Sequence, residues 1–286
     1  METNSLTIAS INVNGIRAAF RKGFAEWLAA NPVDIVALQE VRATRAEVEP
    51  LLADLDGEWH FVNDEASAKG RAGVAILSRI APVAVRTNIG PEDFDTAGRW
   101  LEADFEHAGE RVTVVSCYVH SGEADTPKQV EKYKFLDAMI EYLPQLEAKN
   151  PLSVVVGDLN VGHRELDIKN WRGNVKRAGF MPQERAYFDQ FFGASGAVVD
   201  CVDGTSAPGL GWIDIGRKFA GEVDGPYTWW SQRGQAFDND TGWRIDYQMA
   251  TPALAAKVAD YRVHRAASYA ERWTDHSPVV VKYVFA

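Results

Sequence analysis

A carboxylate and an amide stand two residues apart, directly after a short apolar run, in the stretch Ser153-Val154-Val155-Val156-Gly157-Asp158-Leu159-Asn160. Such a run predicts a strand buried on both faces. If the extended geometry persists beyond it, Asp158 and Asn160 share a face. A carboxylate acceptor beside a neutral amide donor could place a water molecule against an electrophile. Gly, Asp and Asn are also common turn residues, so the pair alone leaves an ordinary turn open.

Two further polar groups could take part in the same chemistry. Glu40 ends an apolar stretch, and Asp275 and His276 precede the last predicted strand. Magnesium takes one or two carboxylates from a protein and keeps several waters, so Glu40 with Asp275 or Asn12 would meet that minimum. Asp246 could bind one nitrogen of His276, which would fix the tautomer and hold an imidazolium near neutral pH. Taken singly, the glutamate also fits a solvated strand end and the histidine a structural hydrogen bond.

The elements that must position these residues are many strands and few helices. The patterns predict helices over 23–30, from 126–127 through 143, and over 184–193. They predict strands over 6–12, 34–40, 59–63, 73–78, 100–105, 111–119, 153–156, 229–230, 243–250 and 279–285. Hairpin-like and strand–helix–strand spacings alternate, which favours an α/β (α+β) fold of two mixed β-sheets packed face to face with helices outside. Catalytic groups are then expected on loops at one edge of this scaffold.

Composition indicates one ordinary globular domain, residues 1–286. Hydrophobic residues make up 46% of the chain and charged residues 24%, and no repeat or Pro/Ser-rich linker interrupts it. No apolar run is long enough for a membrane span, and the N-terminus lacks a secretory signal. Cys117 and Cys201 are expected to be reduced core thiols, and no cysteine–histidine spacing suggests zinc. We therefore expect a cytoplasmic monomer that does not bind membranes.

The charge of the chain is acidic as a whole and basic in two places. The net charge of −10 argues against a polyanionic partner. Two groups of basic residues contain no acid, namely Lys169, Arg172, Lys176 and Arg177 in one and Arg17, Arg21 and Lys22 in the other. Because the local field decides binding, nucleic acid is not excluded, although either group could simply be a solvated face.

Eight stretches, taken in order along the chain, resemble the exodeoxyribonuclease III family of apurinic/apyrimidinic endonucleases, within the endonuclease/exonuclease/phosphatase superfamily. They are 11–15, 38–40, 98–99, 118, 157–161, 227–230, 242–247 and 275–278. The resemblance implies a four-layer αββα sandwich and a Mg²⁺-dependent DNA repair phosphodiesterase, with Mn²⁺ as the alternative ion. Its partner would be double-stranded DNA, which it would incise at abasic sites and degrade from 3′ ends as a 3′→5′ exonuclease.

The resemblance also implies roles for single residues. The metal would be bound by, or lie near, Asn12, Glu40, Asp158, Asn160, Asp275 and His276. The catalytic residues would be Tyr118, Asp158, Asn160, Asp246 and His276. The substrate would contact Arg99, Asn170, Arg172, Asn174, Arg177, Trp229, Trp243 and Ile245. Which of Asp158, Tyr118 and His276 is general base or acid stays open.

Three of these positions, Trp229, Trp243 and Ile245, match residues that line a pocket for a flipped-out abasic sugar in that family. An abasic nucleotide costs little to flip, because no stacking or pairing is lost. Core packing is the alternative use of such large apolar side chains. Asn170, Arg172, Asn174 and Arg177 lie in the segment that meets the DNA backbone in the family, where phosphate contacts position a duplex without reading its sequence.

The chain departs from the family pattern at three places. Ile11 stands where many members have an aromatic residue, His120-Ser121 where a proline and then an amide are common, and Trp171 where proline is usual. These changes leave the named catalytic residues intact and bear on the ratio of exonuclease activity to abasic-site cleavage.

Two competing functions can be compared with this pattern. Inositol-phosphate phosphatases, sphingomyelinases and RNA deadenylases share the Glu, Gly-Asp-Asn and Asp-His parts, but they should lack the Trp-lined pocket and the basic segment 169–177. A DNA-binding module without catalysis would have lost at least one of five residues. All five are present, namely Glu40, Asp158, Asn160, Asp246 and His276.

Overall fold

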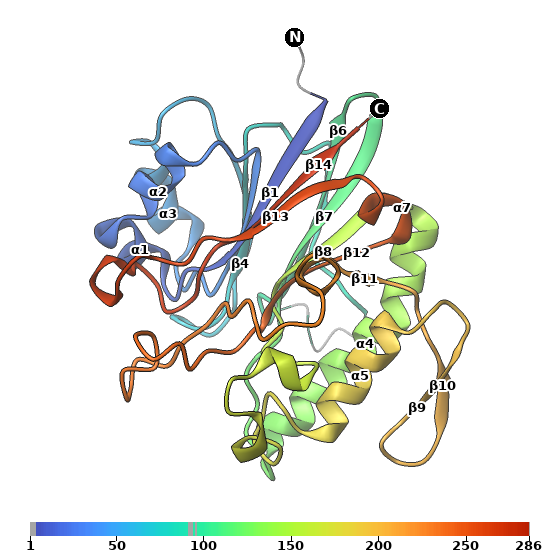
Figure 1. Ribbon diagram of the computed structural model, residues 1–286. Helices are drawn as coiled ribbons and strands as arrows, with labels where there is room; N and C mark the ends of the chain where they lie inside the picture. The colour runs from blue at the N-terminus through green and yellow to red at the C-terminus, as the bar shows by residue number, and fades with distance from the viewer. Residues whose placement is uncertain (1–3, 91–93, 95, 286) are drawn as a thin grey trace.

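The computed structural model describes residues 4–90, 94 and 96–285, and its centre is a pair of six-stranded mixed sheets packed face to face (Figure 1). The first sheet has the order β13-β14-β1-β2-β4-β3 and the second β11-β12-β8-β7-β6-β5. The first consists of β1 (Ser5–Asn12), β2 (Ile35–Gln39), β3 (His60–Asp64), β4 (Val74–Ser78), β13 (Val258–Val263) and β14 (Val279–Val284). The second consists of β5 (Ala84–Arg86), β6 (Trp100–His107), β7 (Glu110–Tyr118), β8 (Ser153–Asp158), β11 (Ile213–Asp214) and β12 (Asp246–Ala250). A separate hairpin is formed by β9 (Val198–Asp200) and β10 (Ser206–Pro208).

Helices cover the outer face of each sheet. The helices α1 (Ile16–Lys22), α2 (Phe24–Ala30) and α3 (Arg45–Leu52) lie on the first sheet, and α4 (Pro127–Lys149) and α5 (Pro182–Phe192) on the second (Figure 1). Shorter helices are α6 (Ile215–Ala220), α7 (Pro252–Ala255) and the 3₁₀ turns η2 (Glu165–Asp167), η3 (Trp171–Gly173) and η4 (Tyr269–Glu271). This four-layer αββα arrangement confirms the predicted fold class.

Strand β8 is buried on both faces, as its apolar run predicts. Val154 and Val156 belong to the core between the two sheets, whereas Val155 packs with Phe135 in the core under α4. Alternate side chains of a strand point to opposite faces, so a strand in the middle of a four-layer fold needs apolar residues at every position. The polar Asp158 at its end therefore needs partners of its own.

The polar ends of the central strands meet at one edge of the sandwich. Strands β1 and β2 run parallel and end at Asn12 and Gln39, next to Glu40, while β7 and β8 run parallel and end at Tyr118 and Asp158. Strand β12 runs antiparallel to β8 and begins there with Asp246. The expected gathering of polar residues at a single sheet edge follows from these directions.

The structure corrects several predicted boundaries. Residues 229–230 are not a strand. Among the described residues, Trp229 forms only isolated bridges, to Trp243 and His276, and does not join either sheet. Strand β12 therefore begins at Asp246 and not at 243. Gly23, with φ of 127°, separates α1 from α2, so the helix predicted over 23–30 is the second of two.

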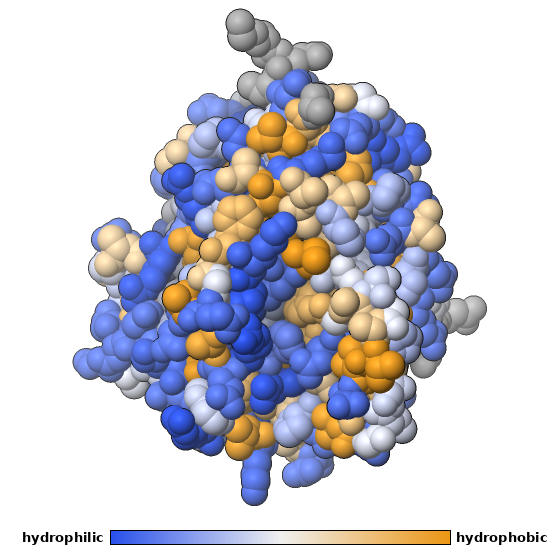
Figure 2. Space-filling view, turned by 45° about the vertical axis from the view of Figure 1, so that its right-hand side comes forward, coloured by the Kyte–Doolittle hydropathy of each residue, from blue (hydrophilic) through white to orange (hydrophobic). Residues whose placement is uncertain are grey.

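One prediction about the cysteines is wrong. Cys117 is buried, but Cys201 follows the β9 strand and is partly exposed, so it is not a core thiol. Among the described residues, no helix has both the length and the apolarity to cross a membrane. The face drawn in Figure 2 is mostly hydrophilic, with hydrophobic residues in small separate groups.

Candidate active site

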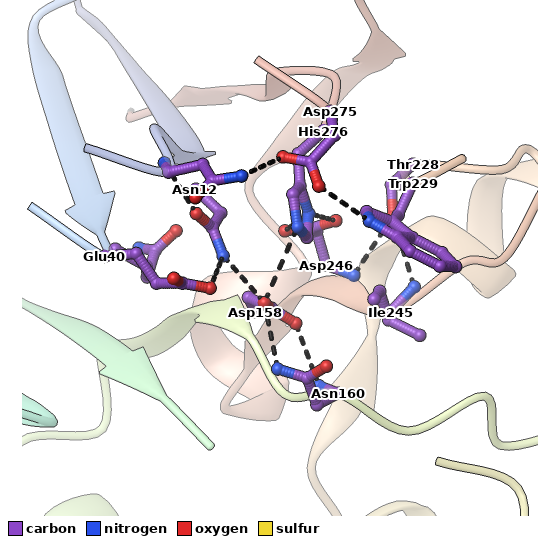
Figure 3. A network of polar contacts seen from close by, with 12 residues as sticks. Asn12, Glu40, Asp158, Asn160, Thr228, Trp229, Ile245, Asp246, Asp275 and His276 are labelled. Atoms are coloured by element: carbon purple, nitrogen blue, oxygen red, sulfur yellow. Dashed lines mark hydrogen bonds and ion pairs between the residues drawn. The ribbon is translucent and has the colours of Figure 1, made fainter. Parts of the chain in front are cut away.

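Asp158, Asp246 and His276 form the centre of the polar edge, and all three are buried (Figure 3). Asp158 and Asp246 are direct neighbours in the β8–β12 register. His276 Nδ1 lies 2.8 Å from Asp246 Oδ2, and His276 Nε2 lies 3.8 Å from Asp158 Oδ2. The imidazole therefore stands between two carboxylates, with one ring nitrogen toward each.

A buried threonine holds this group together from behind. Thr228 Oγ1 accepts hydrogen bonds of 3.1 Å from the backbone N–H groups of Ile245 and Asp246. The backbone N–H of Ser277 donates to the Thr228 carbonyl at 2.7 Å. Thr228 thus fixes the start of β12 and the segment after His276 relative to one another (Figure 3).

Asp158 also accepts hydrogen bonds from two amides, one from each sheet. Asn12 Nδ2 donates to Asp158 Oδ2 at 2.8 Å, and Asn160 Nδ2 donates to the same oxygen at 3.0 Å. The pairing of Asp158 with Asn160 does not come from extended geometry, as the spacing suggested. Asn160 has φ of 50°, in the left-handed region that asparagine tolerates, and this turn brings its side chain back over the strand end.

Glu40 lies on the first-sheet side of the same network. Its Oε1 accepts a 2.9 Å hydrogen bond from Asn12 Nδ2, and its Oε2 pairs with Arg42. Asn12 therefore bridges Glu40 and Asp158 with one amide nitrogen. Glu40 is 9% exposed, so this carboxylate stands near the opening of the site.

Asp275 is held by two neutral donors. Asn14 Nδ2 donates to its Oδ1 at 2.9 Å, and Trp229 Nε1 donates to its Oδ2 at 3.1 Å. Burial alone would raise the pKa of Asp275, but the charge of His276 and these hydrogen bonds lower it. Asp275 is therefore a carboxylate at neutral pH, and it lies beside His276 and Trp229 (Figure 3).

Two members of the buried trio, Asp158 and His276, have pKa values far from their ordinary ones. Burial raises the pKa of Asp158 to about 8, with His276 opposing and Asp246 and Glu40 reinforcing the shift. Burial alone would lower the pKa of His276, but the Asp246 and Asp158 carboxylates raise it to about 10. Groups with such perturbed pKa values cluster where protons are moved, and a carboxylate that binds a proton near neutral pH suits a general base.

Tyr118 and Arg99 lie side by side at the neighbouring strand ends, where the Tyr118 N–H donates to the Arg99 carbonyl at 2.9 Å. Burial, with the Glu40 and Asp158 carboxylates, raises the pKa of Tyr118, so its phenol keeps its proton. Arg99 Nη1 lies 2.8 Å from His120 Nδ1. A phenol and a guanidinium together offer an anion several donors.

The donor set is suited to a hard divalent cation. Glu40 and Asp275 are carboxylates flanked by the amides of Asn12 and Asn14, and hard cations prefer such oxygen ligands. One ligand atom each from Asp158, Asp246 and His276 lies within 4.8 Å of the others, and these three residues could also bind a metal ion. In the trio of Asp158, Asp246 and His276, Asp246 already accepts a hydrogen bond from the imidazole. Glu40 is more exposed than Asp246. The residues therefore fit a metal ion.

A partly apolar wall stands beside this network. Trp229 and Trp243 meet edge to face with ring centroids 6.0 Å apart, and both are partly exposed. Ile245 is 4% exposed and follows Trp243 in the chain (Figure 3). Trp230, by contrast, is buried in a small cluster with Phe237. Because Trp229 also donates to Asp275, this wall is connected directly to the polar network.

The four predicted backbone-contacting residues lie apart from the catalytic side chains. They line or flank a depression of about 410 Å³ around η3, formed by Lys169, Asn170, Trp171, Arg172, Gly173, Asn174 and Arg177. Arg172 stacks 4.5 Å from the Trp171 ring, and within the described residues neither Arg172 nor Arg177 forms an ion pair. The Lys169 N–H donates to the Gly242 carbonyl at 3.1 Å, which ties this segment to the residue before Trp243.

Sequence reasoning missed several residues that hold the site. Asn14 and Arg42 each stand two residues beyond a predicted site residue, Asn12 and Glu40, so the same spacing argument could have included them. Thr228 lay within a recognised stretch, but nothing in its type indicated that its hydroxyl would accept two backbone N–H groups.

Comparisons with known proteins agree with this geometry. Residues 9–276 match the model of the Endonuclease/Exonuclease/phosphatase family. The chain is 32% identical over 275 residues to an exodeoxyribonuclease of Bacillus subtilis (strain 168), covering 96% of this chain and 98% of that protein. An AP endonuclease structure from Archaeoglobus fulgidus superposes with a TM-score of 0.78 at 26% identity, covering 97% and 99% of the two chains. The 3′ phosphatase NExo from Neisseria, solved with a product DNA hairpin, gives 0.78 at 28% identity, covering 98% and 100%.

Proposed function

The chain belongs to the Endonuclease/Exonuclease/phosphatase family, and we propose that within it this protein is a metal-dependent DNA repair nuclease. It incises duplex DNA at abasic sites and removes nucleotides or blocking groups from 3′ ends. The relatives named exodeoxyribonuclease, AP endonuclease and 3′ phosphatase support this function. One observation carries it: five side chains from four distant parts of the sequence converge in a single polar network, namely Glu40, Asp158, Asn160, Asp246 and His276.

In this mechanism Asp158 activates the attacking water. Its raised pKa suits a group that takes a proton near neutral pH. Asn160 donates to Asp158 at 3.0 Å and to the Val119 carbonyl at 2.8 Å, so its amide is rigidly held and can orient the water. Such fixed geometry lowers the entropy cost of the attack.

His276 holds a phosphate oxygen. Its Nδ1–H is bonded to Asp246, which fixes the ring and leaves Nε2 as the donor toward the substrate. An imidazolium in a buried site stabilises the negative charge that develops on the phosphate in the transition state. Tyr118, whose phenol stays protonated, and Arg99 supply further donors at the neighbouring strand ends.

Glu40 binds Mg²⁺ or Mn²⁺, with Asp275, Asn12 and the other polar side chains of the network in or near its coordination shell. The ion, when bound, neutralises charge on the phosphate and leaving oxygen. The Glu40 carboxylate, which is 9% exposed and lies beside the Asn12 amide, supports this assignment. The Arg42 guanidinium beside Glu40 would have to share that carboxylate with the ion.

Substrate selection rests on the wall and the basic segment. Trp229, Trp243 and Ile245 enclose the extruded abasic sugar. They exclude a nucleotide that still carries its base, because the base is too large for this space. Asn170, Arg172, Asn174 and Arg177 contact phosphates on one side of the site. The exposed guanidinium groups of Arg172 and Arg177, which form no ion pair within the part of the chain that the structure describes, support this role.

The test uses labelled duplexes with and without one tetrahydrofuran abasic analogue, and a duplex with a recessed 3′ end. We expect Mg²⁺-dependent cleavage at the analogue, 3′ shortening of the recessed duplex, and loss of both in EDTA. Absence of cleavage at the analogue by a folded protein with Mg²⁺ or Mn²⁺ would refute the abasic-site function. Hydrolysis of small phosphate esters without DNA cleavage would favour a phosphatase instead.

A further inference from the structure

His120 holds the guanidinium of Arg99 beside the proposed active site. The imidazole Nδ1 lies 2.8 Å from Arg99 Nη1, and Nε2 lies 2.8 Å from the carbonyl oxygen of Lys128 on α4. A carbonyl can only accept, so Nε2 carries the proton, and arginine can only donate, so Nδ1 offers its lone pair. The neutral Nε2–H tautomer of His120 thus satisfies both partners.

The surrounding charges favour this neutral form. Burial and the charge of Arg99, with a smaller contribution from Lys132, lower the pKa of His120 to about 4. The hydrogen bond to the Lys128 carbonyl and the charge of Glu131 oppose this shift. At pH 7 the imidazole is therefore uncharged. It orients the guanidinium without neutralising it.

Arg99 is consequently a partly buried cation whose charge His120 does not neutralise, so it can bind an anion of the substrate. Within the described residues it forms no ion pair, and its Nε is buried without a hydrogen-bond partner. Buried guanidinium groups are normally paired with carboxylates, because an uncompensated charge is costly. The Arg99 backbone pairs with that of Tyr118 at the strand ends. A guanidinium with no carboxylate partner among the described residues suits a phosphate oxygen, which arginine binds through its planar fork.

The segment that carries His120 is itself fixed. The Val119 carbonyl accepts from Asn160 Nδ2 at 2.8 Å, and the Ser121 carbonyl accepts from the buried Lys132 Nζ at 3.2 Å. The backbone on both sides of His120 is therefore held in place, so the imidazole can hold Arg99 in a fixed orientation.

We propose that His120 is a positioning residue that orients Arg99 to receive a phosphate oxygen of the DNA strand next to Tyr118. This inference rests on the proposed nuclease function. It predicts that substrate binding depends on the hydrogen-bond acceptor at position 120 and that this dependence passes through Arg99.

The test compares His120→Ala, His120→Asn, Arg99→Ala and the His120→Ala/Arg99→Ala double variant. The dissociation constant for a tetrahydrofuran-containing duplex is measured in EDTA, and KM and kcat are measured with Mg²⁺. We expect His120→Ala to raise Kd and KM about tenfold with little change in kcat, as for loss of a hydrogen bond to a charged group. His120→Asn, whose Oδ1 keeps an acceptor near the Nδ1 position, should restore binding. The matched control is His60→Ala, on β3 away from the site, which should bind like wild type.

The double-variant cycle separates positioning from a general structural role. If His120 acts through Arg99, His120→Ala adds little to the loss caused by Arg99→Ala; fully additive losses, or wild-type Kd in His120→Ala, overturn the inference. Should His120→Ala fail to fold, His120→Asn and His120→Phe replace it. Equal binding by those two also overturns the inference, and weaker binding by His120→Phe alone supports it. Failure of the wild type to bind or cut the abasic duplex would instead count against the proposed function.

Discussion

At the residue scale, hydrogen bonds within the site determine which polar atoms of each side chain already have a partner. Asp246 occupies Nδ1 of His276, so Nε2, which lies 3.8 Å from Asp158 Oδ2, is the ring nitrogen left for another partner. Asp275 accepts hydrogen bonds from Asn14 and Trp229, whereas Glu40 accepts one from Asn12 and pairs with Arg42. These commitments suggest different kinetic signatures for His276 and Glu40.

We expect His276→Asn to lower kcat by about three orders of magnitude or more, because it removes a charged donor to the transition state. The dissociation constant for uncleaved abasic duplex in EDTA should stay within about threefold of wild type, since the phosphate contacts of the basic segment remain. Single-turnover cleavage and equilibrium binding measure the two quantities. Near-wild-type turnover would remove His276 from the mechanism.

Glu40→Gln should act through the metal. The substitution keeps the shape and one acceptor oxygen but removes the negative charge, so the Mg²⁺ concentration for half-maximal rate should rise about tenfold or more and the rate at saturation should fall. A Mg²⁺ titration of cleavage measures this effect, with Glu47→Gln, which is exposed on α3, as the control. An unchanged titration curve would contradict the assignment of Glu40.

The sequence predicted which polar residues lie together better than it predicted the reasons for their proximity. Asp158 and Asn160 do lie together, but through a left-handed turn at Asn160 and not through an extended strand. Asn12 reaches Asp158 across the interface between the sheets, over 146 residues of sequence, and no local pattern encodes that distance. Thr228 and His120 depend equally on tertiary contacts and could not be assigned from their surroundings in the chain.

At the element scale, a glycine and a buried ion-pair network fix the strands that carry the site. Gly157 has φ of 154°, and a Cβ there would lie 1.8 Å from the Cys117 carbonyl oxygen, so only glycine permits this approach of β8 to β7 just before Asp158. Behind β12, Arg244 is buried and donates to Asp167 at 2.7 Å and to both Asp214 oxygens at 2.7 and 3.0 Å. The strand that begins with Asp246 is thereby anchored to η2 and to the start of α6.

The Asp167 carboxylate should make stability depend on acid pH. Burial alone would raise its pKa, but the charge and hydrogen bonds of Arg244 lower it to about 2, below the usual value of about 3.9 expected when unfolded. The folded state therefore favours the ionised form, and this stabilisation is present above about pH 4 and is lost as the pH falls through about 2.

Asp167→Asn should lower the free energy of unfolding by about 3 kcal/mol at pH 7, because it breaks a buried ion pair. The deficit should shrink by about 2 kcal/mol between pH 4 and pH 2. Urea titrations at stepped pH measure both values. Asp260→Asn is the control, since its pair with Arg262 is exposed and contributes little. A deficit independent of pH would mean that packing, and not charge, explains the loss.

At the scale of the whole molecule, an acidic protein is proposed to bind a polyanion through local basic surfaces. The chain carries −10 net charge, yet Arg172 and Arg177 lie exposed and without ion pairs among the described residues. The sequence patterns predicted two packed sheets with α2, α4 and α5 outside them, but they did not predict α3 or the strands β5, β11 and β13. The hairpin of β9 and β10 and the separation of α1 from α2 were not predicted either, because their short segments carry too little periodicity.

Replacing Arg172 and Arg177 together by alanine should reduce the steepness of log K against log [salt] by about 2, about one unit for each lost phosphate contact. Binding of uncleaved duplex in EDTA at several salt concentrations gives the slope. Arg262→Ala, on β13, is the matched control, and its slope should equal that of wild type. An unaltered slope in the double variant would mean that the basic segment is a solvated surface that does not contact DNA phosphates.

The amide of Asn12, which bonds Glu40 from its own sheet and Asp158 from the other, has a consequence for the life of the molecule. The catalytic network is complete only while both halves of the sandwich are docked, because its side chains come from both sheets. A protein whose two sheets have separated therefore keeps every catalytic residue and still lacks the active site.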